Sequence, residues 1–196
     1  MIRGILLAAG ESARFGSPKL LHRLPNSSAI GAQAARNLIA GTGNALAVIR
    51  PGHGDIAALM CEAGCDIYVA RRALEGMGSS LAAAIESSRD ASGWVVALAD
   101  MPFIDPLTIA AVKAALERGA ALAAPLLNAT GERGHPVGFS SALMNELLAL
   151  NGDRGARAVI EAHLGELIGI PTDDGGVIAD IDVVADIGKA DAGHLR

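Results

Sequence analysis

Short apolar runs alternate along the first two thirds of the chain with segments whose apolar positions recur at helical spacing. The apolar runs, which suit strands buried on both faces, lie at residues 2–9, 45–50, 66–70, 93–100 and 120–125. Helices are predicted between them at residues 27–39, 55–64, 79–88 and 106–119. Strands that alternate with helices in this way favour a mostly parallel sheet covered by helices on both faces.

The last third of the chain is less regular. GERGHPVGFS at 131–140 has no clear period, and further elements are predicted as helices near 141–150 and 155–163 and as strands near 166–170 and 177–182. No internal repeat or linker is visible, and 196 residues are ample for one core but few for two. We therefore expect a single domain over residues 1–196.

Composition and charge exclude several classes of partner. The net charge of -5 and the five aromatic residues (one Trp, one Tyr and three Phe) offer neither a basic surface nor a stacking platform for nucleic acid. No window approaches the roughly 18 uninterrupted apolar residues of a membrane span, and the N-terminal segment lacks a signal-peptide pattern. We expect a cytoplasmic protein that contacts neither nucleic acid nor membrane.

The loop after the first predicted strand, GESARFGSPK, has the residue types of a polyphosphate site. Gly10 and Gly16 allow the backbone to approach a ligand closely, and Arg14 and Lys19 bring two cations to the same loop. The spacing matches neither a Walker motif nor the dinucleotide fingerprint. An ordinary turn with solvated charges is the alternative, and the residue types alone leave both open.

A carboxylate follows the apolar run GWVVALAD, where a ligand is expected to bind outside the ends of parallel strands. Asp100 is a candidate magnesium ligand, because Mg²⁺ prefers one or two carboxylates together with phosphate oxygens and water. A helix N-cap is the alternative role for an Asp at this point. Asp105 lies closer to the following helix and suits that role better.

Three further segments carry candidate binding residues. In EGMGSSL, Ser79 and Ser80 lie in a first helical turn whose free backbone donors could bind anions or base and ribose oxygens, although plain capping by Ser79 is equally open. GERGHPVGF offers Arg133, Gly134 and His135, and NGDRGAR offers Asp153, Arg154 and Arg157. A lone His is more often a packed or surface residue than a catalyst, and charges near Asp153 could belong to a solvated helix start.

Taken together and in this order, the segments resemble one family. LLAAGESARFGSPKLL is similar to the nucleotide-binding signature of the MobA-like nucleotidyltransferases, and ADMPF, EGMGSSL, GHPVGF and GDRGAR resemble blocks of its molybdenum cofactor cytidylyltransferase branch. The resemblance covers about residues 2–182. It implies an α/β, three-layer Rossmann-like fold with a mostly parallel, mixed sheet of the nucleotide-diphospho-sugar transferase type.

The activity that the resemblance implies is transfer of CMP from CTP to molybdopterin-bound molybdenum cofactor, with release of pyrophosphate. Mg²⁺ is the implied cofactor, and CTP, the molybdopterin cofactor and a molybdenum hydroxylase or its chaperone are the implied partners. Guanylyltransferase relatives typically have LAGG where this chain has LAAG, so Ala9 favours cytosine over guanine.

The resemblance also assigns residues to roles. It implies that Arg14, Lys19 and Asp100 are catalytic, the first two on phosphates and the third on magnesium. The implied nucleotide contacts are Leu7, Ala8, Ala9, Gly10, Gly16, Ser79, Ser80 and Leu81. The implied acceptor contacts are Arg133, His135 and Asp153. Asp182 is the implied second metal ligand, although this chain continues with VVADIGKA where the family commonly has a stretch like DIDTPEDL.

Two other functions remain open from the sequence. One is a nucleotidyltransferase that uses GTP or another acceptor, such as a sugar phosphate or an alcohol phosphate. The other is a non-catalytic protein that binds the cofactor and delivers it to a molybdenum enzyme, which the altered stretch after Asp182 favours. A binding protein has no evident need for Arg14, Lys19 and Asp100 together.

Overall fold

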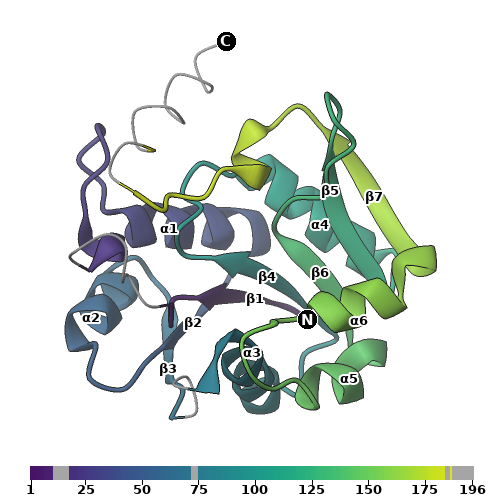
Figure 1. The fold of residues 1–196 in the computed structure, drawn as a ribbon, viewed down its shortest axis with the longest axis horizontal. Helices are drawn as coiled ribbons and strands as arrows, with labels where there is room; N and C mark the ends of the chain where they lie inside the picture. Colours follow the sequence, from purple (N-terminus) through teal and green to yellow (C-terminus); the bar gives the residue numbers. More distant parts are fainter. Residues whose placement is uncertain (11–17, 72–74, 184–185, 187–196) are drawn as a thin grey trace.

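A mixed sheet forms the centre of the protein (Figure 1). The computed structural model describes residues 1–10, 18–71, 75–183 and 186, and within them seven strands pair in the order β3-β2-β1-β4-β6-β5-β7. The strands are β1 (Ile2–Leu7), β2 (Leu46–Ile49), β3 (Asp66–Val69), β4 (Gly93–Leu98), β5 (Leu122–Leu127), β6 (Val137–Ser140) and β7 (Leu167–Thr172). Only β6 pairs antiparallel with its neighbours among these strands.

Helices cover both faces of the sheet. One face packs against α1 (Ile30–Thr42), α2 (Gly54–Glu62) and α4 (Pro106–Glu117), and the other against α3 (Met77–Ser87), α5 (Met144–Leu148) and α6 (Arg157–Ala162). Short 3-10 helices are η1 (Lys19–Leu21), η3 (Ser141–Leu143), η4 (Leu164–Glu166) and η5 (Gly175–Ile178). The predicted three-layer α/β fold is confirmed. In the described part of the chain, no helix has the length and apolar character needed to cross a membrane.

Side chains of β4 alternate between two hydrophobic cores, one on each face of the sheet. Val95 and Ala97 belong to the core under α1, α2 and α4, and Trp94 and Val96 belong to the core under α3, α5 and α6. The Trp94 indole is fully buried, and its Nε1 donates a hydrogen bond to the Ser88 hydroxyl at 3.0 Å. The strand is therefore buried on both faces, as its continuous apolar run predicts.

Two glycines determine how α1 packs and where it ends. A Cβ at Gly41 would lie 2.6 Å from Cβ of Ile109, so the glycine lets the two helices approach closely inside α1. The helix continues past the predicted end near residue 39 and stops at Gly43, whose φ of 85° is left-handed. It also begins later than predicted, at Ile30, after an N-cap without a side-chain hydrogen bond.

Two elements of the C-terminal third differ from the expectation. The segment 131–140, which has no clear period, contains β6 between β4 and β5. The predicted strand at 177–182 is wrong: η5 covers Gly175–Ile178, and the side chain of Asp174 caps it by accepting from the Gly176 N–H at 2.9 Å. The segment after η5 still packs at the carboxyl end of the central strand β4, because the Ile181 N–H donates to the Asp100 carbonyl at 3.0 Å.

Candidate functional site

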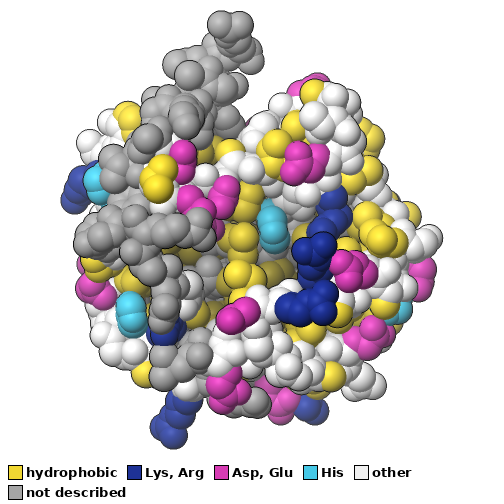
Figure 2. All heavy atoms as spheres, viewed as in Figure 1, with side chains coloured by type: hydrophobic (Ala, Val, Ile, Leu, Met, Phe, Trp, Pro, Cys, Tyr) yellow, Lys and Arg dark blue, Asp and Glu magenta, His cyan; other side chains and the backbone are white. Residues whose placement is uncertain are grey.

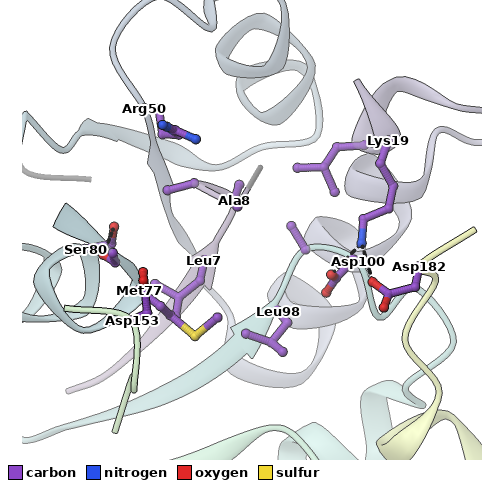
Figure 3. Close-up of a pocket in the computed structure, with 15 residues that line it drawn as sticks. Leu7, Ala8, Lys19, Arg50, Met77, Ser80, Leu98, Asp100, Asp153 and Asp182 are labelled. Carbon is purple, nitrogen blue, oxygen red and sulfur yellow. Dashed lines mark hydrogen bonds and ion pairs between the residues drawn. The ribbon is translucent and has the colours of Figure 1, made fainter. Parts of the chain in front are cut away.

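A cavity of about 480 Å³ opens at the carboxyl ends of β1 and β4, the place where parallel sheets bind ligands (Figure 3). The two strands end in register, with Leu7 opposite Leu98. The predicted site residues that line this cavity are Leu7, Ala8, Ala9, Gly10, Lys19, Ser80, Asp100, Asp153 and Asp182. Arg14 and Gly16 lie outside the described residues.

Lys19 connects the two predicted metal ligands. Its Nζ lies 2.8 Å from Oδ2 of Asp100 and 3.5 Å from Oδ1 of Asp182, and Figure 3 shows it between the two carboxylates. The Lys19 side chain is 11% exposed, so this cation is held in a partly dry site. Lys19 belongs to η1, and Asp100 lies just after β4. Asp182 comes directly after Ile181, whose N–H donates to the Asp100 carbonyl. Three segments distant in sequence thus place a cation between two carboxylates.

Three of the predicted ligand contacts have a buried polar atom without a hydrogen-bond partner. Within the described residues, the buried side-chain polar atoms without a hydrogen-bond partner are Oγ of Ser79, Oδ1 of Asp100 and Nδ1 of His135. Buried polar atoms are almost always paired in folded proteins, and unpaired ones call for a functional explanation. All three belong to residues that the sequence analysis selects for ligand contacts. Of the three, Asp100 lines the first cavity, so one unpaired carboxylate oxygen belongs to a residue of this site.

The start of α3 has a structural partner that the sequence did not indicate. The Gly78 N–H donates to the Gly152 carbonyl at 2.7 Å, so this backbone donor is not free for a ligand. Ser80 faces the cavity, and its hydroxyl donates to the Gly76 carbonyl at 3.1 Å. Ser79 is 3% exposed and does not cap the helix. The segments 76–80 and 151–155 therefore form one wall together.

Leu81, a predicted nucleotide contact, points elsewhere. It is 1% exposed, packs in the core beneath α3 and lines a second cavity instead of the first.

The Gly76→Ala variant is expected to destabilise this wall strongly. Gly76 has φ 117°, and an added Cβ would lie 2.4 Å from the Gly152 carbonyl carbon and 2.3 Å from Oδ1 of Asp153. Left-handed strain and a backbone clash together predict a loss of about 2–4 kcal/mol in the free energy of unfolding. Urea denaturation measures it. Gly165→Ala, where nothing lies within 4 Å of the added Cβ, is the matched control. Equal effects of the two substitutions would contradict the close packing of 76–80 on 151–155.

The second cavity, of about 350 Å³, adjoins the first and holds two of the three predicted acceptor contacts. Leu7, Met77 and Leu98 line both cavities. Arg133 and His135 line the second, whereas Asp153 lines the first. Its apolar wall comes from the core under α3, α5 and α6, including Leu81, Val96, Val137, Phe139 and Ile160. Figure 2 shows a hollow with hydrophobic side chains at its floor and a row of cationic side chains beside it.

The electrostatic environment of His135 connects the two cavities. Burial, followed by the charge of Arg133, lowers the pKa of His135 below its ordinary value. The charge of Asp100 and a hydrogen bond with the backbone of Val96 act in the opposite direction and are smaller. The imidazole is therefore neutral at pH 7, and it lies close enough to Asp100 to sense its charge.

Arg50 is a charged residue of the site that the sequence analysis missed. Arg50 directly follows β2 and lines the first cavity across from Asp100, as Figure 3 shows. The rule that placed Asp100, a charged residue after a buried strand, applies equally to Arg50 and could have found it. Arg154 and Arg157, which the NGDRGAR segment offers either as candidates or as part of a solvated helix start, line the second cavity.

Gly10, Lys19 and a carboxylate pair lie together at the carboxyl edge of a mixed α/β sheet, beside a second cavity, an arrangement that suits a polyphosphate and a second ligand. The chain matches the MobA-like NTP transferase domain over residues 4–167, and it belongs to that family. The resemblance stated above is thus confirmed for the family, and the fold is that of nucleotide-diphospho-sugar transferases.

Individual relatives extend this comparison. The bifunctional protein GlmU of Xanthobacter autotrophicus is 30% identical in an alignment 165 residues long that covers 81% of this chain and 36% of GlmU. The chain thus spans about a third of that relative. Rv0371c of Mycobacterium tuberculosis H37Rv is 26% identical with a TM-score of 0.78, covering 96% of both chains. Its structure in complex with manganese gives 25% identity and a TM-score of 0.76, covering 96% of this chain and 97% of Rv0371c.

Proposed function

We propose that this protein is a magnesium-dependent cytidylyltransferase that transfers CMP from CTP to a molybdopterin-type molybdenum cofactor and releases pyrophosphate. We also propose that residues 1–196 form one nucleotidyltransferase domain. The observation that carries the transferase chemistry is Lys19 held between Asp100 and Asp182 beside the Gly10 loop. Such a set can position a triphosphate and neutralise the charge that develops on it.

The carboxylates fit a magnesium ion that is shared with the nucleotide. Asp100 has a buried Oδ1 without a partner, and a cation already lies between Asp100 and Asp182 in the form of the Lys19 ammonium. Across the described part of the chain, no three His, Cys, Asp or Glu side chains converge to hold a metal ion by themselves. Phosphate oxygens must complete the coordination, which is the usual arrangement for Mg²⁺. The manganese complex of Rv0371c supports a divalent ion in this fold.

The chain's residues need only orient two anions for the proposed reaction. An acceptor phosphate oxygen attacks the α-phosphorus of CTP, a new P–O bond forms, and the bond to the bridging oxygen of pyrophosphate breaks. The Lys19 ammonium can move to the triphosphate and neutralise part of its negative charge. Magnesium bound at Asp100 and Asp182 would neutralise the leaving pyrophosphate. No general base is required, because a phosphate nucleophile is already ionised at pH 7.

The choice of base and acceptor rests on fewer residues. Ala9 lines the nucleotide cavity at the position where guanylyltransferase relatives have glycine, which favours CTP. The apolar wall of the second cavity, with Val137, Phe139 and Ile160, suits a planar acceptor such as a pterin better than a hydroxyl-rich sugar. GlmU, with 30% identity, makes a sugar phosphate the second candidate acceptor.

Thermal melting with CTP, GTP, ATP and UTP in the presence of Mg²⁺ tests the base. A nucleotide at about 100 times its dissociation constant adds roughly 2.7 kcal/mol to the free energy of unfolding, so CTP is expected to raise the melting temperature most. A larger shift with GTP would overturn the cytosine assignment.

Pyrophosphate release with CTP and extracted molybdopterin cofactor tests the transfer itself. Turnover is expected with this acceptor and not with glucosamine 1-phosphate. Turnover with the sugar phosphate alone would establish the second candidate, and tight CTP binding without turnover on either acceptor would establish a binding or delivery protein.

A further inference from the structure

The second cavity has an excess of positive charge that the proposed reaction does not use. Arg133, Arg154 and Arg157 line it together with one carboxylate, Glu161. His135 is neutral there because burial and the charge of Arg133 lower its pKa. Three positive charges and one negative charge leave a formal charge of +2 above an apolar wall.

The three arginines all act on one carboxylate of the cavity, that of Glu161. Nε of Arg157 lies 2.7 Å from Oε1 of Glu161. The hydrogen bond from Arg157 and the charges of Arg157, Arg154 and Arg133 all lower the pKa of Glu161, so the three guanidinium groups are within electrostatic reach of one carboxylate. Neither Arg133 nor Arg154 lies within ion-pair distance of a carboxylate among the described residues. Two of the three cations therefore remain available to a ligand.

These cations lie away from the reacting phosphates. Lys19 and Asp100 line the first cavity, and the two cavities meet at Leu7, Met77 and Leu98. An acceptor whose phosphate reacts in the first cavity must pass this junction, and its body then lies among the arginines. If the non-reacting part of the acceptor were neutral, it would displace water from the guanidinium groups without replacing the hydrogen bonds that the water makes. An anionic group would instead form charge-assisted and bidentate hydrogen bonds with them.

We infer that the acceptor carries a second anionic group, distal to its reacting phosphate, which Arg133 and Arg154 bind. The inference rests on the proposed function only in that the second cavity holds the acceptor. It identifies the substrate class as molecules that are anionic at both ends, and it excludes monophosphates with a neutral body as good acceptors. Arg157, which is paired with Glu161, orients that carboxylate and limits the positive charge.

Two stable sugar phosphates serve as probes of this requirement. Glucose 1-phosphate and glucose 1,6-bisphosphate differ by one distal anion, and their dissociation constants are measured by calorimetry on the whole protein with CTP and Ca²⁺ in place of Mg²⁺. The bisphosphate is expected to bind at least about tenfold more tightly than the monophosphate, because hydrogen bonds to charged groups are strong. The Arg133→Gln, Arg154→Gln double variant is expected to bind the two compounds to within about twofold of each other.

The matched control is Arg118→Gln, at the exposed C-terminal end of α4, which should keep the preference for the bisphosphate. Equal affinity of the wild-type protein for the two probes would overturn the inference, and so would an undiminished preference in the double variant. CTP binding, measured in the same samples, reports separately on the proposed function. Loss of CTP binding or of pyrophosphate release would contradict that function and leave the distal-anion result to stand on its own.

Discussion

The Asp100→Asn variant is expected to release pyrophosphate at least about a thousandfold more slowly than the wild-type protein, a loss of about 4 kcal/mol in transition-state stabilisation. Asparagine keeps the shape of the side chain but removes its negative charge. The buried Oδ1, which has no partner, and Oδ2, which accepts from Lys19 at 2.8 Å, then no longer form a carboxylate ligand for a divalent ion. Continuous pyrophosphate detection under saturating CTP measures the effect.

Folding is not expected to explain that loss. Asp100 is 26% exposed, and an ion pair that solvent reaches contributes about 1 kcal/mol or less to stability, so the melting temperature should change by only a few degrees. Asp90→Asn, at an exposed position after α3, controls for the change of one surface charge. Near-normal turnover by the Asp100 variant would show that this carboxylate does not bind the metal and would remove the central residue from the proposed site.

The sheet was predictable because its strands carry their own signal. Trp94 to Ala97 are all buried, alternately against α1 and α4 or against α3 and α6, and only a continuous apolar run can satisfy both faces. The same burial makes a polar residue after the run conspicuous, which is how Asp100 was found. Local sequence therefore predicted the parallel half of the sheet and indicated Asp100, which lines the first cavity.

The remaining features depend on contacts between distant segments. β6 has only four residues, and its Gly138 lies under α4, where a Cβ would come within 2.8 Å of Val112. A short strand with a glycine shows no period, so its place between β4 and β5 could not be predicted from the sequence. The docking of Gly78 on Gly152 is equally non-local.

The arginines of the second cavity illustrate the same limit. Arg154 and Arg157 precede or begin α6 and have the spacing of an ordinary solvated helix face. Only the fold brings them opposite Arg133, which comes from the segment before β6. A cluster of like charges from separate elements has no signature in either segment alone, and the charge of this cavity therefore became visible only in three dimensions.

Replacing Lys19 by methionine is expected to have opposite effects on metal and on nucleotide. Its ammonium occupies the space between Asp100 and Asp182, at 2.8 and 3.5 Å, where a divalent ion would bind. Two unit charges about 4 Å apart interact by about 4 kcal/mol near a protein surface, so removing this cation takes away a competitor for a metal ion at the two carboxylates. Allowing for solvent at the partly exposed Asp182, Mn²⁺ without nucleotide should bind about tenfold more tightly to Lys19→Met than to the wild-type protein.

The affinity for nucleotide should fall in the same variant, because the triphosphate loses a cation that it would otherwise attract away from the carboxylates. CTP with Mg²⁺ is therefore expected to bind Lys19→Met at least about tenfold more weakly. Electron paramagnetic resonance of free Mn²⁺ and calorimetry with CTP measure the two affinities. Lys113→Met, which removes a cation paired with Glu117 on α4, should change neither. Equal Mn²⁺ affinity of the Lys19 variant and the wild-type protein would contradict this hypothesis. It would show that Lys19 does not compete with a divalent ion at the two carboxylates when nucleotide is absent.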